Sequence, residues 1–268
     1  MHISLAYGQY GLPVELPDEA VVLRPHERPG LADEPTAIQE ALHAPIGSPP
    51  LVELLHRDSR VVVVFSDITR PMPNDRVLPV LLAELERVVP AAQITLLNAL
   101  GTHRPNTPAE LRTMLGAELA ARYRVEQHNA WDAQHLVPLG RTPQGHQIAV
   151  NRTFHGSDIR ILTGFIEPHF FAGFSGGPKA VLPGIASIDA IMDNHGYSLL
   201  RDPRATWGIT EGNPVWEEMR AAAEMAQPHF LLNVTLNSQR AITDVFAGEP
   251  MAAHARGVRA ARAQAMVP

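Results

Sequence analysis

The amino-acid sequence predicts an α/β protein with a layered, mostly parallel sheet and flanking helices. Short apolar runs rich in β-branched residues recur along the chain, and helical patterns separate them. Two strand–loop–helix units follow one another, at residues 60–89 and 93–123. This alternation is typical of a parallel sheet that is covered by helices. We therefore predict that residues 1–268 form one α/β domain.

Each element of the first half follows from a local pattern. Residues 3–16 alternate apolar and polar side chains around glycines, which predicts a small strand or hairpin. Residues 33–43 form a helical pattern with a proline in its first turn. The continuous apolar run at 60–67 predicts a strand that is buried on both faces. The elements expected next are a helix at 76–89, a strand at 93–100 and a helix at 107–123 with Thr107 as its cap.

The second half continues the same alternation around one long loop. Residues 147–168 contain two candidate strands, and a loop rich in glycine and aromatic residues follows at 169–184. A helix is expected from Ser187 onward. The remaining expected elements are an amphipathic helix at 213–227, a strand at 229–237 and an alanine- and arginine-rich helix in the last stretch, 250–268.

Composition excludes several classes of function. The net charge of -6 and the pI of about 6.1 give no basic surface for nucleic acid or an anionic membrane. The absence of cysteine excludes disulfides, thiolate catalysis and cysteine-based metal sites. No apolar run is long enough to span a bilayer, and the first residues lack the pattern of a signal peptide. We therefore expect a cytoplasmic protein.

The chain has 22 lysine and arginine residues, and Lys179 is the only lysine among them. Arginine serves wherever a positive charge suffices, but it is never deprotonated in proteins. A lysine amine can act as a nucleophile or form a covalent bond. Lys179 is either a chance survivor of a compositional bias or a residue whose amine is needed.

Three unusual loops follow predicted strands. They are SDITRP at 66–71, LGTHRP at 100–105 and GFIEPHFFAGFSGGPK at 164–179. Ligands of open α/β sheets bind at the carboxyl ends of the strands. We therefore expect the three loops to bring their polar side chains together at one edge of the sheet. These side chains are Asp67, Thr69, Arg70, His103, His169 and Lys179.

The polar residues of the first two loops permit two interpretations each. Arg70 could bind a carboxylate or phosphate through two hydrogen bonds. Alternatively, Asp67 caps the following backbone and pairs with Arg70 in an ordinary turn. His103 and His169 could act as paired proton donors and acceptors, because imidazole titrates near neutrality. Alternatively, they are hydrogen-bonded or surface residues among the 13 histidines of the chain.

The glycine loop around Lys179 matches neither common phosphate-binding motif. Ala180 replaces the hydroxyl residue of a P-loop, and no GxGxxG opens a helix there. We infer that the loop holds a ligand through the lysine amine. His195 ends a predicted helix in MDNHG, without other ligands at metal-site spacing. If it binds a metal, the remaining ligands come from a non-protein group.

Together these segments resemble the nickel-dependent lactate racemase family. The resemblance also includes the later segments EGNPVWEEM and NVTLNSQRAITDVFAG, and so covers essentially the whole chain. The segments that carry it most specifically are Asp67-Ile68-Thr69-Arg70-Pro71, Gly101-Thr102-His103-Arg104, His169, Phe174-Ser175-Gly176-Gly177 with Lys179, and Asp193-Asn194-His195.

The resemblance implies the N-terminal, cofactor-carrying domain of a racemase or epimerase of lactate or a related 2-hydroxy acid. It implies that Lys179 carries a pyridinium-3-thioamide-5-thiocarboxylate mononucleotide (the nickel-pincer nucleotide) covalently, and that His195 ligates its nickel. His103 and His169 would be the general bases of a proton-coupled hydride transfer, and Arg70 would bind the substrate carboxylate. The residues expected to line the cofactor are Asp67, Ile68, Thr69, Arg70, Gly176 and Gly177.

The resemblance also implies partners. Family members have a C-terminal α/β domain, and we expect this chain to lack it and to be folded but poorly active alone. Enzymes that synthesise the cofactor would be further partners. Two alternatives stay open: the same cofactor serving a different hydride-transfer reaction, and a non-catalytic α/β domain that binds an anion.

Overall fold

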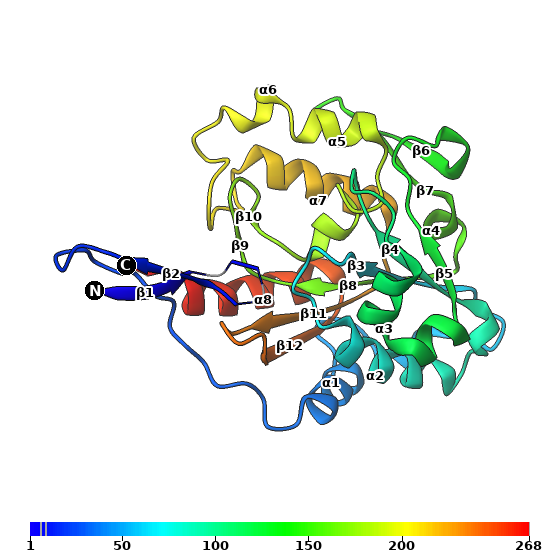
Figure 1. Cartoon of the computed structure of the whole chain (residues 1–268). Coiled ribbons are helices and arrows are strands. Elements are labelled where there is room, and N and C mark those ends of the chain that lie inside the picture. Colours follow the sequence, from blue (N-terminus) through cyan, green and yellow to red (C-terminus); the bar gives the residue numbers. More distant parts are fainter. Residues whose placement is uncertain (6, 9, 268) are drawn as a thin grey trace.

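The computed structural model describes residues 1–5, 7–8 and 10–267. Within them, a six-stranded sheet has the order β12-β11-β8-β3-β4-β5 (Figure 1). All neighbouring strands are parallel except β12, which is antiparallel to β11. The prediction of a mostly parallel sheet is therefore confirmed. The strands are β3 (Val61–Ser66), β4 (Ile94–Ala99), β5 (Arg124–Gln127), β8 (Ile159–Phe165), β11 (Phe230–Leu236) and β12 (Ile242–Gly248).

Helices cover both faces of this sheet. One face carries α1 (Glu34–His43), α2 (Asn74–Glu86) and α3 (Pro108–Arg122). The other face carries α5 (Ile188–Asn194), α7 (Pro214–Ala226) and α8 (Pro250–Ala265) (Figure 1). Strand β3 shows why the sequence run is apolar throughout. Val61 and Val63 pack into one core and Val62 and Val64 into the other, and all four side chains are buried.

Smaller elements surround the main sheet and its two layers of helices. Three two-stranded sheets pair β1 (His2–Leu5) with β2 (Leu12–Glu15), β6 (Leu136–Arg141) with β7 (Gln147–Asn151), and β9 (Pro168–His169) with β10 (Gly173–Phe174). The β1–β2 hairpin projects away from the body of the molecule (Figure 1). Short helical segments are α4 (Arg152–Gly156), α6 (Tyr197–Leu200), η1 (Leu51–Leu54), η2 (Ala91–Gln93), η3 (Ala133–His135) and η4 (Gly177–Ala180).

The capping residues in the sequence predicted the starts of α1 and α3 to within one residue. The Asp33 carboxylate accepts a hydrogen bond from the Thr36 N–H at 3.0 Å and caps α1. Thr107 forms a capping box with Glu110 at the start of α3, as the sequence suggested. The helix predicted at 107–123 is present, and it contains a kink that the pattern did not indicate. Gly116 has φ of 79° and kinks α3, because glycine tolerates a positive φ that other residues avoid.

The chain order of the strands creates a crevice. From the central strand β3 the chain proceeds to β4 and β5 on one side, and it later returns to β8 on the other side. The carboxyl ends of β3 and β8 therefore diverge at a topological switch point, where α/β sheets bind ligands. Separately, no helix of the described residues combines the length and apolarity needed to cross a membrane. The cytoplasmic location stays a prediction.

Candidate functional site

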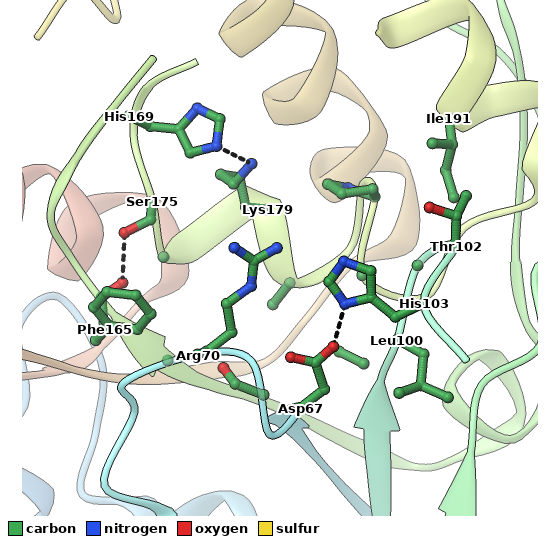
Figure 2. Close-up of a pocket in the computed structure, with 18 of the residues that line it drawn as sticks. Asp67, Arg70, Leu100, Thr102, His103, Phe165, His169, Ser175, Lys179 and Ile191 are labelled. Atoms are coloured by element: carbon green, nitrogen blue, oxygen red, sulfur yellow. Dashed lines mark hydrogen bonds and ion pairs between the residues drawn. The ribbon is translucent and has the colours of Figure 1, made fainter. Parts of the chain in front are cut away.

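A cavity of about 300 Å³ opens at the carboxyl ends of β3, β4 and β8. Its volume is in the range of small-molecule sites. Figure 2 shows side chains from the three predicted loops and from α5 around it. The polar and charged residues of its wall include Asp67, Arg70, His103, Glu167, His169, Lys179 and His195.

Asp67 closes the turn after β3 and orients His103. The Asp67 carboxylate is 3% exposed, and its Oδ1 accepts hydrogen bonds from the Thr69 N–H at 3.1 Å and the Thr69 hydroxyl at 2.7 Å. Its Oδ2 is hydrogen-bonded to Nδ1 of His103 (Figure 2). The expected turn cap is present, but the partner of Asp67 is His103 and not Arg70. An ionised carboxylate accepts from Nδ1–H, which leaves Nε2 of a neutral His103 as a proton acceptor.

Arg70 lies on the cavity wall as an exposed cation. Among the described residues, it takes part in none of the ion pairs within 4.0 Å. Glu167 is exposed as a whole residue, yet desolvation raises the pKa of its carboxyl and the Arg70 charge opposes that rise. The Arg70 guanidinium is therefore free to bind an anion such as a carboxylate.

Two predicted cofactor residues of the same loop lie outside the cavity wall. Ile68 is partly buried and packs against the hydrophobic core, and the Thr69 hydroxyl donates a hydrogen bond to Asp67. Gly177 also lies off the wall, whereas Gly176 belongs to it. The assignment of Ile68, Thr69 and Gly177 to a cofactor stays a prediction.

Lys179 and His169 meet inside the cavity. The Lys179 Nζ lies 3.3 Å from Nε2 of His169 and 5.9 Å from the centre of the Phe171 ring. Burial, followed by the Arg70 charge, lowers the pKa of Lys179 to about 7. Nδ1 of His169 accepts the Ala172 N–H at 3.3 Å, so a neutral His169 carries its proton on Nε2. That proton points at the lysine nitrogen, an arrangement that suits an uncharged amine.

Electrostatics keep His169 uncharged as well. Burial is the main cause, and the positive charges of Lys179 and Arg70 add to it, with a smaller effect of His195. Together they lower the pKa of His169 to about 3. At neutral pH the cavity therefore contains a neutral imidazole beside an amine that is partly unprotonated.

His195 caps the C-terminal end of α5 and presents an unpaired ring nitrogen. Its backbone N–H donates to the Ile191 carbonyl at 2.9 Å, and its ring meets the Phe171 ring edge-on at 5.1 Å. Nδ1 of His195 is buried and has no hydrogen-bond partner among the described residues. Burial, with the Lys179 charge second, lowers the pKa of His195 to about 4. A neutral imidazole with a free nitrogen is a good metal ligand.

The side chains that the structure describes do not form a metal site by themselves. Across residues 1–5, 7–8 and 10–267, no three His, Asp or Glu side chains gather as a metal-binding group. Since protein-bound metals need several ligands, a metal on His195 would need donor atoms from a bound group.

Sequence reasoning missed three residues around the site, namely Glu167, Asn233 and His254. Asn233 could have been noticed, because an amide within the apolar run FLLNVTL must find buried partners. His254 gave no signal, because it is one histidine within an ordinary helical pattern. Its imidazole is fully buried in α8, where it donates through Nε2 to the Ser175 carbonyl at 3.0 Å.

His254 leads to a prediction on acid stability. Burial lowers its pKa from 6.5 to about 4, although the hydrogen bond to Ser175 opposes the shift. In the unfolded chain His254 therefore binds a proton below pH 6.5, whereas in the folded chain it stays neutral until about pH 4. We expect the free energy of unfolding to fall by about 3 kcal/mol over this window from His254 alone.

Urea unfolding at several pH values measures this effect. His169 and His195 are shifted in the same direction and steepen the fall. The carboxyl pKa values of Glu110, Asp158 and Asp202 are lowered to about 2, so these groups lose stability mainly below about pH 5, and the slopes are compared above that pH. His254→Gln keeps a hydrogen-bond donor but cannot titrate. In this variant the free energy of unfolding should depend less steeply on pH, by the equivalent of about one proton. Equal slopes in both proteins would contradict the prediction.

Comparison with known proteins agrees with the resemblance seen in the sequence. The family model described as the lactate racemase N-terminal domain matches residues 7–208. The lactate racemase of Thermoanaerobacterium thermosaccharolyticum is 35% identical over 261 residues, 96% of this chain and 61% of that protein. The lactate racemase of Lactiplantibacillus plantarum is 39% identical over 224 residues, 84% of this chain and 53% of that protein. The chain thus spans less than two thirds of the length of these curated relatives.

Solved structures agree with the fold. The lactate racemase apoprotein of Thermoanaerobacterium thermosaccharolyticum superposes with a TM-score of 0.90 at 35% identity, covering 100% of this chain and 63% of that one. A protein from Thermotoga maritima superposes with a TM-score of 0.72 at 26% identity, covering 88% of this chain and 60% of that one.

Proposed function

Because the chain belongs to the lactate racemase family, we propose that it is the cofactor-carrying part of an enzyme that racemises lactate or a related 2-hydroxy acid. The observation that carries the proposal is the single cavity in which Lys179, His169 and His195 meet at the carboxyl ends of the strands. Lys179 supplies an amine and Arg70 a cation on the wall, and His195 supplies a ring nitrogen without a partner among the described residues.

We propose that the cavity holds the nickel-pincer nucleotide. Lys179 would carry it covalently and His195 would ligate its nickel. The donor set fits, since an orphaned imidazole nitrogen is buried there and the side chains provide no further metal-binding group in the described residues. When bound, this group supplies the acceptor for a hydride from the α-carbon of the substrate.

Arg70 and the two imidazoles would handle the substrate itself. The guanidinium binds the carboxylate of the 2-hydroxy acid through two hydrogen bonds and fixes its orientation. Figure 2 draws His169 and His103 apart, with the Arg70 and Lys179 side chains between them. Imidazoles on two sides of a substrate can remove the hydroxyl proton from one enantiomer and return a proton to form the other. Asp67 holds His103 in the tautomer that accepts a proton at Nε2.

Attachment at Lys179 would also change His169. The Lys179 charge is the second cause, after burial, of the lowered pKa of His169. An amine joined in a thioamide no longer carries that charge. Loading would thus replace the Lys179 charge beside His169 by the charges of the bound group, which couples loading of the site to the proton chemistry of His169.

We further propose that a second domain completes the site, as the resemblance to the two-domain family implies. The cavity is open, and His103 remains 40% exposed beside it. Groups from another domain would exclude water and select among 2-hydroxy acids. Enzymes that synthesise the cofactor are the other partners of this proposal.

The decisive experiment uses the chain purified from a host that makes the cofactor. We expect intact mass to show one adduct, peptide mapping to place it on Lys179, and nickel to be present in equal amount. Chiral chromatography should detect interconversion of D- and L-lactate when the chain is extended by the remaining part of the Thermoanaerobacterium relative. An adduct without interconversion of any 2-hydroxy acid would favour another hydride-transfer reaction. Absence of both the adduct and nickel would contradict the proposal and would favour an anion-binding domain centred on Arg70.

A further inference from the structure

The loop that carries Lys179 rests on a buried amide outside the cavity. Asn233 lies in the middle of β11 and is 0% exposed. Its Oδ1 accepts the Gly177 N–H at 2.9 Å, and its Nδ2 donates to the Leu232 carbonyl at 3.1 Å. Asn233 does not belong to the cavity wall. Its side chain therefore joins the sheet to the glycine loop without reaching a ligand.

The space around this amide is shaped by glycines. Asn233 is the register partner of Gly164 on β8, and a Cβ at Gly164 would lie 3.3 Å from the Asn233 Nδ2. A Cβ at Gly176 would lie 2.6 Å from the Asn233 Oδ1 and 2.9 Å from the Phe165 carbonyl oxygen. Gly176 also has φ of +75°. Only glycine permits the loop to approach the sheet this closely.

His254 supports the same loop from α8. Its imidazole is 1% exposed and donates to the Ser175 carbonyl at 3.0 Å. A Cβ at Gly177 would lie 2.5 Å from Cδ2 of the His254 ring, so the bare Gly177 backbone sits against the imidazole. The peptide from Ser175 to Gly177 is thus hydrogen-bonded on one side to His254 and on the other to Asn233.

These two supports, Asn233 and His254, form what we call the seat of the Ser175–Gly177 peptide. The seat fixes the start of the segment that carries the Lys179 amine. The Lys179 N–H donates to the Gly176 carbonyl at 3.1 Å, and the Gly184 N–H donates to the Lys179 carbonyl at 3.1 Å. Lys179 is therefore two residues beyond a peptide with two buried supports. We propose that Asn233 and His254 are positioning residues, which seat the Ser175–Gly177 peptide and thereby aim the Lys179 amine into the cavity. The proposal rests on the proposed function of Lys179 as the attachment point.

Two substitutions at Asn233 separate positioning from stability. Asn233→Leu keeps the shape but removes the acceptor for Gly177, whereas Asn233→Asp keeps an acceptor oxygen. Thr235→Val is the matched control, because Thr235 is buried on the same strand and bonds Thr243 at 2.8 Å, away from the loop. His254→Leu tests the seat from α8, and it serves also if Asn233→Leu fails to fold.

Hydrogen exchange of the 174–180 segment, in the chain without cofactor, is the first readout. We expect faster exchange at Gly177 in Asn233→Leu, with protection kept in Asn233→Asp and Thr235→Val. The second readout is the rate of adduct formation at Lys179, which should fall by at least roughly tenfold in Asn233→Leu, because small misplacements of reacting groups are costly. The acidic variant should recover most of that rate.

Unchanged exchange and unchanged loading in both Asn233→Leu and His254→Leu would overturn the inference. An equal loss in Thr235→Val would do the same, since the effect would then follow stability and not position. If the unsubstituted chain forms no adduct, the proposed function fails, while the exchange data still decide whether the seat exists.

Discussion

Exchange of Lys179 for arginine is expected to remove the proposed covalent adduct completely, and with it the proposed nickel binding. Arginine stays protonated in proteins, so its side chain cannot provide the neutral amine that covalent attachment needs. The lysine amine is prepared for this role, because burial lowers its pKa to about 7. The measurement is intact mass together with metal analysis on protein from a host that makes the cofactor.

Two further variants control for charge and for the presence of a lysine. Lys179→Met tests loss of the amine without a permanent charge in the cavity, and it should also load no adduct. In Lys179→Arg combined with Arg201→Lys, the chain again has one lysine, but on an exposed position. We expect that lysine to stay unmodified. An adduct on it, or one persisting in Lys179→Arg, would show that the cavity does not select the attachment point.

The fold was predictable where one strand or helix carries its own signal. The continuous apolar run from Val61 to Val64 predicted a strand that is buried on both faces, and all four side chains are buried in the sheet. Helices with a capping residue, such as Asp33 or Thr107, were placed within a few residues of their ends. Strands β5, β6 and β12 were missed. β5 and β12 lie at the two edges of the main sheet and β6 lies in a separate pair, so pairing with distant segments determines them.

The site was predictable in outline because the carboxyl ends of parallel strands meet. Loops after β3, β4 and β8 had to lie together once the sheet was recognised. Specific partners were not predictable. The Asp67–His103 hydrogen bond joins residues 36 positions apart, and it depends on the register of β3 and β4. The seat under Gly177 likewise depends on α8 crossing beneath the loop.

If the proposed function holds, removal of either imidazole should abolish most of the turnover while leaving the proposed cofactor attached. We expect His103→Ala and His169→Ala to reduce racemisation by about 10²- to 10⁴-fold in both directions. Both directions suffer, because each turnover needs one group to accept a proton and another to return it. Asp67→Asn should act in the same direction as His103→Ala, since an amide can stabilise the wrong tautomer of His103.

The assay is chiral separation of D- and L-lactate with the variants placed in the extended chain described above, and adduct and nickel are measured on the same samples. His135→Ala is the matched control, because His135 and Asp132 also form a histidine–aspartate pair, at 2.7 Å, outside the cavity wall. Its turnover should equal that of the unsubstituted protein. Full turnover by His103→Ala or His169→Ala would remove that imidazole from the mechanism. If activity and adduct are lost together, the substitution instead disturbs the position of Lys179, whose Nζ lies 3.3 Å from Nε2 of His169.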